Sequence, residues 1–161
     1  LPVDEQEEKE AESDCKKMME LIFDIYNGAD KGTASNVVLN DETVLEMQKR
    51  LMETGCPVST LVTYSNMENY ESVDRFLEKC TDGKSGSVVI YEIHGDGGIG
   101  RMKFIFDGTE MYVEALSSFQ EVSFLRTPKG LNSIAFQGRV STTHLRYEFP
   151  RTPHKLECFF L

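Results

Sequence analysis

Ser87-Val-Val-Ile-Tyr-Glu-Ile-His94 opens the stretch of sequence that decides the fold. It leads into Gly95-Asp-Gly-Gly-Ile-Gly100, then Arg101-Met-Lys-Phe-Ile-Phe106, then Asp107-Gly-Thr109, then Glu110-Met-Tyr-Val-Glu114. β-branched, aliphatic and aromatic residues dominate the three longer runs, and glycine-containing segments separate them. This pattern is typical of antiparallel strands joined by tight turns. We therefore predict a meander of strands over this stretch.

The alternation of side chains within these runs predicts which faces are buried. Both faces of the first run are partly apolar, which is typical of a central strand. In the second run Met102, Phe104 and Phe106 share one face, and Arg101 and Lys103 lie on the other. We therefore expect the second strand to have a solvent-exposed side.

Helical periodicity precedes the strands. Apolar residues recur at three- and four-residue spacing in three segments, each with capping residues before it and glycine after it. We expect helices from Ser13 to Gly28, from Asn40 or Asp41 to Gly55, and, after a lead-in over Ser65–Asn69, from Tyr70 to Gly83. Pro57 prevents the second helix from continuing. Residues 58–64 then favour a brief strand.

Strand-like runs also follow the meander. They cover Glu121–Arg126, Ser133–Gln137, Thr142–Phe149 and Leu156–Leu161, separated by segments rich in glycine and proline. Residues 126–161 carry six basic and two acidic side chains, against eleven and twenty-five in residues 1–125. The tail after about residue 138 thus differs in charge and spacing from the rest of the chain.

Helices followed by a run of antiparallel strands predict the α+β class. We expect the N-terminal helices to pack on one face of a C-terminal, curved antiparallel meander. A cystatin-like or NTF2-like arrangement, in which a bent sheet cups a helix, is the named version of this architecture that we expect.

Length and charge limit the functions to consider. A chain of 161 residues corresponds to about one domain with a core of its own. The formal net charge of −10 disfavours binding to nucleic acid, since an acidic surface repels phosphates. No apolar run approaches the roughly 18 residues that cross a bilayer, so we expect no membrane span.

The first twelve residues are strongly acidic. The sequence starts Leu1-Pro2-Val3 without methionine and continues with seven acids and one base over Asp4–Asp14. One interpretation is an acidic tether over residues 1–12, behind a removed signal or lipid anchor upstream of Leu1, followed by a single domain over residues 13–161. The other interpretation is a charged first turn of helix.

Four cysteines are widely spaced: Cys15, Cys56, Cys80 and Cys158. They form no C-x-x-C pair and have no histidine pair at zinc-finger spacing, so we expect no metal site. Both disulfides and buried thiols remain compatible with this spacing.

Gly95, Gly97 and Gly100 match the dinucleotide-binding pattern G-x-G-x-x-G. In that motif the third glycine begins a helix whose N-terminus holds the pyrophosphate. Here a strand-like run with period two follows instead. We therefore predict a hairpin connection at these glycines and no nucleotide or other cofactor.

Tyr91, Glu92 and His94 are the candidate acid–base residues. Glu92 interrupts the most apolar strand, where it either faces solvent at the margin of a helix-covered face or projects into a pocket that would raise its pKa. His94 and Asp96 flank the hairpin turn, where solvated turn residues are the simpler interpretation.

Several segments resemble an uncharacterised domain family found in extracytoplasmic lipoproteins of Gram-positive gut bacteria. They are Asn66-Met-Glu-Asn-Tyr-Glu-Ser-Val-Asp-Arg-Phe-Leu77, Gly86-Ser-Val-Val-Ile-Tyr-Glu-Ile93, Asp96-Gly-Gly98, Phe106-Asp-Gly108 and Met111-Tyr112. The resemblance covers about residues 67–119, and its motifs are structural. It implies a location outside the membrane and a cleaved lipoprotein signal upstream of Leu1, and it carries over no functional residue.

Two hypotheses about function follow. The first is a non-enzymatic extracytoplasmic module of a cell-surface lipoprotein, which binds an unknown protein or small molecule or serves as a structural part. The alternative is a small pocket enzyme of NTF2-like architecture that uses a carboxylate and a histidine, with Tyr91, Glu92 and His94 as its candidates. Without a lipid anchor, the expected location is the cytoplasm.

Overall fold

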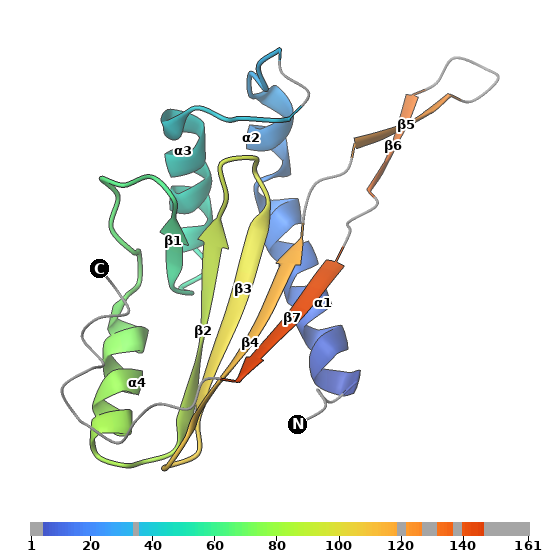
Figure 1. Cartoon of the computed structure of the whole chain (residues 1–161). Coiled ribbons are helices and arrows are strands. Elements are labelled where there is room, and N and C mark those ends of the chain that lie inside the picture. The colour runs from blue at the N-terminus through green and yellow to red at the C-terminus, as the bar shows by residue number, and fades with distance from the viewer. Residues whose placement is uncertain (1–4, 34–35, 119–121, 127–131, 137–139, 147–161) are drawn as a thin grey trace.

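The computed structural model describes residues 5–33, 36–118, 122–126, 132–136 and 140–146, with side chains up to residue 117 (Figure 1). The helices are α1 (Glu5–Leu21), α2 (Phe23–Gly28), α3 (Asp41–Met52) and α4 (Glu71–Thr81). The strands are β1 (Val58–Thr60), β2 (Gly86–Ile93), β3 (Ile99–Phe106), β4 (Met111–Ser118), β5 (Val122–Arg126), β6 (Asn132–Phe136) and β7 (Val140–Arg146). No described helix is both long enough and apolar enough to cross a bilayer.

One five-stranded sheet has the order β1-β2-β3-β4-β7, and β5 and β6 form a separate two-stranded sheet. β2, β3, β4 and β7 pair antiparallel with their neighbours. The fold therefore confirms the predicted α+β class, with N-terminal helices packed on a mostly antiparallel open sheet. β1 is the exception, because it runs parallel to β2. The connection through α4 has the length that a parallel crossover needs.

The glycine-rich segment forms the predicted hairpin between β2 and β3. Ile93 pairs with Ile99, and the His94 N–H donates to the Gly98 carbonyl at 2.9 Å. Gly97 has a φ of 83°, in the left-handed region that glycine adopts without strain. Gly100 lies within β3 rather than at the start of a helix, so the geometry of a dinucleotide-binding turn is absent from this described segment.

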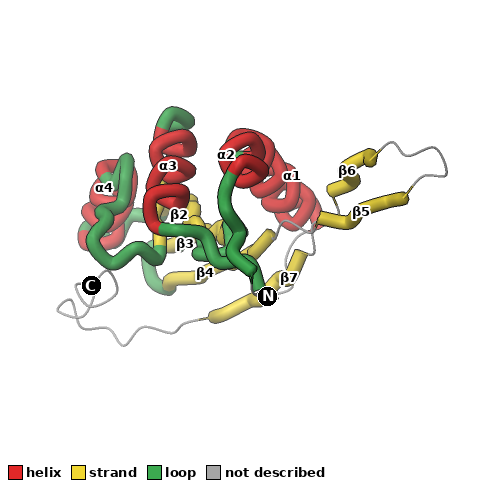
Figure 2. The backbone as a smooth tube through the Cα atoms, turned by 90° about the horizontal axis from the view of Figure 1, so that it is seen from above, coloured by secondary structure: helices red, strands yellow, loops and turns green. Residues whose placement is uncertain are grey.

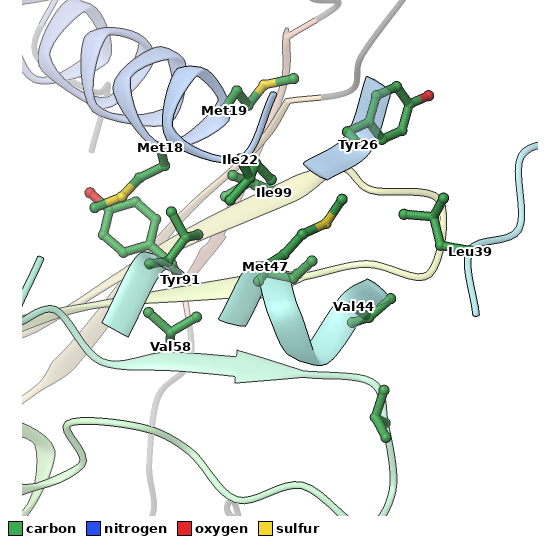
Figure 3. Packing of buried hydrophobic residues seen from close by; sticks show 13 residues of the cluster. Met18, Met19, Ile22, Tyr26, Leu39, Val44, Met47, Val58, Tyr91 and Ile99 are labelled. Carbon is green, nitrogen blue, oxygen red and sulfur yellow. The ribbon is translucent and has the colours of Figure 1, made fainter. Parts of the chain in front are cut away.

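The main core lies between the first three helices and one face of β2 and β3 (Figures 2 and 3). It consists of Met18, Met19, Ile22, Tyr26, Leu39, Val44, Met47, Leu51, Val58, Val62, Tyr91, Ile93 and Ile99. The apolar residues that predicted the first two helices thus form this core. Burial of such side chains is the main favourable contribution to folding.

α4 packs against the other face of β2. Its side chains Val73 and Phe76 form a second cluster with Val88 and Ile90. Because successive side chains of a strand point to opposite faces, Val88 and Ile90 face away from Tyr91 and Ile93 of the main core. β2 is therefore covered on both faces, as its composition predicted, and the helices do not all share one face of the sheet.

α1 begins at Glu5, well before the predicted start at Ser13. Residues 5–12, for which an acidic tether and a charged first turn of helix were both considered, form its first turns. Two contacts explain this correction: Glu7 forms an ion pair with Lys103 on β3, and Ala11 is buried beside Leu116 on β4. α1 then ends at Leu21, and α2 follows separately where one continuous helix was predicted; we have no physical account of that break.

Other boundaries differ by a few residues. The predicted strand over residues 58–64 is shorter, because β1 ends at Thr60. The runs predicted at residues 121–126, 133–137 and 142–149 correspond to β5, β6 and β7, and the run at 156–161 lies outside the described residues. Cys56 and Cys80 are free thiols and Cys15 is buried; Cys158 lies outside the described residues.

Candidate functional site

The two faces of β2 separate the three candidate residues predicted from the sequence. Tyr91 is buried in the main core, whereas Glu92 and His94 point to the opposite face. Burial is the main cause that raises the pKa of Tyr91 to about 12, with a smaller contribution from Asp14. The structure therefore brings Glu92 and His94 together and places Tyr91 elsewhere, as part of the core.

Glu92 and His94 form a partly buried pair. The His94 Nε2 lies 3.5 Å from the Glu92 Oε1, and their side chains are 23% and 30% exposed respectively. The hydrogen bond to Glu92 raises the pKa of His94, burial opposes this shift, and the charge of Asp96 adds to it. The pair can therefore hold a proton on the imidazole of His94. The carboxylate of Glu92 thus contacts His94 at the partly solvated margin of the sheet.

Small side chains flank this pair along the sheet. Glu92 pairs with Ser59 on β1 and with Gly100 on β3, and Gly100 pairs with Ser117 on β4. A Cβ atom on Gly100 would lie 3.1 Å from the His94 Nε2. Glycine at this position therefore leaves room for the imidazole.

A second polar cluster lies beneath α1 and was not predicted. Arg101 was expected on a solvent-exposed side of β3, but α1 covers it and leaves it 4% exposed. Its Nη2 lies 3.4 Å from the Asp14 Oδ2, and its positive charge partly opposes the rise in the pKa of Tyr91. Within the described part of the chain, the Arg101 Nε finds no hydrogen-bond partner. The expected exposure of this side of β3 was wrong, because α1 packs on it and pairs Asp14 with Arg101 and Glu7 with Lys103.

Three large apolar side chains are exposed at the end of the sheet where β2 turns into β3. Val38, Leu61 and Tyr64 are 66%, 63% and 67% exposed, and we call them the apical patch. Val38 precedes Leu39, whose N–H donates to the Gly95 carbonyl of the hairpin at 2.8 Å. Figure 1 shows the loops before α3 and after β1 at this end.

Leu61 and Tyr64 lie on a loop that is closed by local hydrogen bonds. The Thr60 Oγ1 lies 2.8 Å from the Ser65 Oγ, and it accepts the Val62 N–H at 3.1 Å. The Ser65 N–H donates to the Val62 carbonyl at 3.0 Å. Val62 meanwhile is buried in the main core. The loop therefore presents Leu61 and Tyr64 outward from a fixed base.

Side chains of polar residues hold the rest of this connection. Gln48, buried on α3, donates to the Val58 carbonyl at 3.0 Å and to the Asn66 carbonyl at 2.8 Å. Asn69, with a φ of 55°, donates to the Met52 and Cys56 carbonyls at 2.8 and 2.9 Å. Buried and partly buried hydrogen bonds of this kind fix a loop in one conformation.

The apical patch was not predicted from the sequence. Leu61 and Tyr64 were placed in a brief strand, because an apolar run after a proline has strand composition. The signal that could have found them is Ser65-Asn66, a turn-forming pair directly after the run. Among the described residues, no group of three or more histidine, cysteine, aspartate and glutamate side chains is arranged to hold a metal ion.

Comparison with known families matches residues 8–123 to a family of unknown function (DUF6070). The chain belongs to this family. The match includes α1 to α4 and the strands β1 to β4, so it is longer than the resemblance over residues 67–119. No curated protein and no solved structure matches the chain.

Proposed function

We propose that this member of the DUF6070 family is a non-enzymatic binding module, displayed outside the cytoplasm as part of a bacterial surface lipoprotein. It contacts a protein partner through the apical patch of Val38, Leu61 and Tyr64. The observation that carries the proposal is the exposure of these large apolar side chains on loops that are fixed to the core.

Exposed apolar residues on a rigid base have the features of a binding surface. When a partner covers a water-exposed tyrosine or leucine, removal of its apolar surface from water favours binding. A loop that is already ordered loses little conformational entropy on binding. Binding residues also lie preferentially on loops that a rigid scaffold positions. The hydrogen bonds of Thr60, Ser65 and Gln48 supply this scaffold here.

Acid–base chemistry at Glu92 and His94 is the alternative function. The specific observation in its favour is their pairing at 3.5 Å. Two observations favour binding instead. Tyr91 lies on the other face of β2, within the main core, so the three candidates do not converge. The space between the helices and Tyr91 is occupied by apolar side chains (Figure 3).

Site-specific photocrosslinking in the producing bacterium tests the binding function. A photoreactive amino acid replaces Leu61, and the matched control carries it at Glu53, an exposed residue at the other end of α3. We expect a discrete adduct from position 61 and none from position 53. Excess purified domain should compete the adduct away, and the Tyr64→Ala domain should compete poorly. Failure to form an adduct at position 61 would overturn the binding function.

The proposed location rests on the resemblance to lipoproteins and has its own test. The natural gene is expressed in cells that are supplied with labelled palmitate, and intact cells are then treated with a protease. We expect the protein to carry the label and to be digested from outside. If the protein carries no label and is digested only after the cells are lysed, the proposed location is wrong. The binding function is then still decided by the crosslinking experiment.

A further inference from the structure

Acidic side chains outnumber basic ones near the apical patch. The segments at this end of the molecule, residues 29–33, 36–42, 58–65 and 94–98, contain four acids and one lysine. The acids are Asp30, Asp41, Glu42 and Asp96. A surface that combines exposed apolar residues with one sign of charge selects partners of the opposite charge.

Asp41 and Glu42 lie next to Tyr64. The carboxylates of Asp41 and Glu42 are close enough to the Tyr64 hydroxyl to act on it electrostatically. Together with desolvation of the hydroxyl, which is the largest cause, these contacts raise the pKa of Tyr64. Both acids are exposed, so they are accessible to a cation that approaches the ring. They also begin α3, where negative charge is favourable.

The basic groups at this end are already engaged. The Lys31 Nζ lies 3.4 Å from the carbonyl oxygens of Asn27 and Ala29 and 4.7 Å from the centre of the Tyr26 ring. His94 is paired with Glu92. The electrostatic potential that the patch presents is therefore set mainly by its carboxylates.

We propose that the apical patch binds a basic segment of a partner protein, in which lysine or arginine side chains flank an apolar residue. The apolar residue covers Leu61 and Val38, and the flanking cations contact the Tyr64 ring and the carboxylates of Asp41 and Glu42. Cation–π contact and charge attraction favour such a segment at this surface. The proposal rests on the proposed binding function and specifies its partner class.

Titration by NMR with two synthetic peptides tests the partner class. In one peptide lysines flank a central pair of leucines, and in the other glutamates replace the lysines. We expect the lysine peptide to shift the amide signals of residues 38–42 and 61–65 in a saturable manner, with an affinity that falls as salt is added. The glutamate peptide should leave these signals unchanged.

Matched charge variants separate the patch from the net charge of the protein. Asp41→Asn with Glu42→Gln removes two charges beside Tyr64, and Glu46→Gln with Glu53→Gln removes two exposed charges elsewhere along α3. We expect the first variant to bind the lysine peptide more weakly and the second to bind like the unmodified protein. Tyr64→Ala should weaken binding roughly two- to fivefold, the size of one exposed cation–π contact. Thermal unfolding confirms that each variant is folded.

Four results would overturn the partner class: no binding of the lysine peptide, equal binding of the glutamate peptide, shifts outside the patch, or equal weakening by both charge variants. If photocrosslinking at position 61 still captures a partner, only the basic character of that partner is wrong and the binding function stands. If neither experiment gives a signal, both proposals fail.

Discussion

Asp14 on α1 lies 3.4 Å from the buried guanidinium of Arg101 on β3. Arg101 faces Tyr91 across the β2–β3 ladder, so the three residues join the first helix to the centre of the sheet. A buried cation is stable only when a partner compensates its lost hydration. The position of α1 therefore depends on an ion pair as well as on apolar packing.

Asp14→Ala is expected to lower the free energy of unfolding by about 1–3 kcal/mol, because it leaves a buried charge without its carboxylate. Lys17→Ala is the control, since Lys17 contacts the same carboxylate at 3.7 Å from an exposed position and should change stability by less than about 1 kcal/mol. Urea unfolding measures both. Equal effects of the two variants would show that Arg101 does not depend on Asp14.

Much of the fold could be predicted because local signals agreed with tertiary packing. The alternation in residues 87–114 and the glycine turns predicted the β2–β3–β4 meander, and the helical periodicities predicted the cores of α1, α3 and α4. α1 was predicted only in part. Its first turns are so acidic that they suggested a solvated tether, and their partner Lys103 is distant in the sequence.

The candidate site could be predicted less well. Glu92 lies near the end of β2 and His94 directly follows this strand, so strand alternation accounts for their side chains on one face. Val38 lies on a different loop from Leu61 and Tyr64, and a long-range hydrogen bond from Leu39 to Gly95 fixes its loop at the hairpin end of the sheet. A sequence pattern reports neighbours along a helix or a strand, and it contains no signal for loops that meet in space.

Removal of residues 1–12 tests whether the first turns of α1 contribute to stability. A solvated tether would be lost without effect. The contacts of Glu7 with Lys103 and of Ala11 with Leu116 instead predict a loss of about 1–2 kcal/mol, or roughly 2–8 °C in melting temperature for a domain of this size. Differential scanning calorimetry of the shortened and complete chains measures the shift, and an unchanged melting temperature would contradict the docking of these turns.

The Glu92–His94 pair predicts a pH-dependent contribution to stability. Because Glu92 raises the pKa of His94 above its ordinary value of 6.5, the folded protein holds this proton more tightly than the unfolded chain. The stabilisation is therefore complete below about pH 6.5 and is lost as the pH rises through the folded pKa of His94. The difference in unfolding free energy between the unmodified protein and Glu92→Gln should shrink over that range. A constant difference would assign the effect of Glu92 to packing.

Gly97→Ala is expected to be the most destabilising of the glycine substitutions in the hairpin. Gly97 has a positive φ, and a Cβ atom there would lie 2.5 Å from the Tyr26 ring, which is fixed in the main core. Backbone strain and displacement of this ring together should lower the free energy of unfolding by about 2–4 kcal/mol. Gly95→Ala is the matched control, since nothing lies within 4 Å of its added Cβ and its φ is not positive, so its effect should stay below about 1 kcal/mol. Urea unfolding compares the two variants, and the Tyr26 ring signals in an NMR spectrum should move only in Gly97→Ala. If both variants lose equal stability and the ring signals stay in place, the hairpin does not pack against α2 through Gly97.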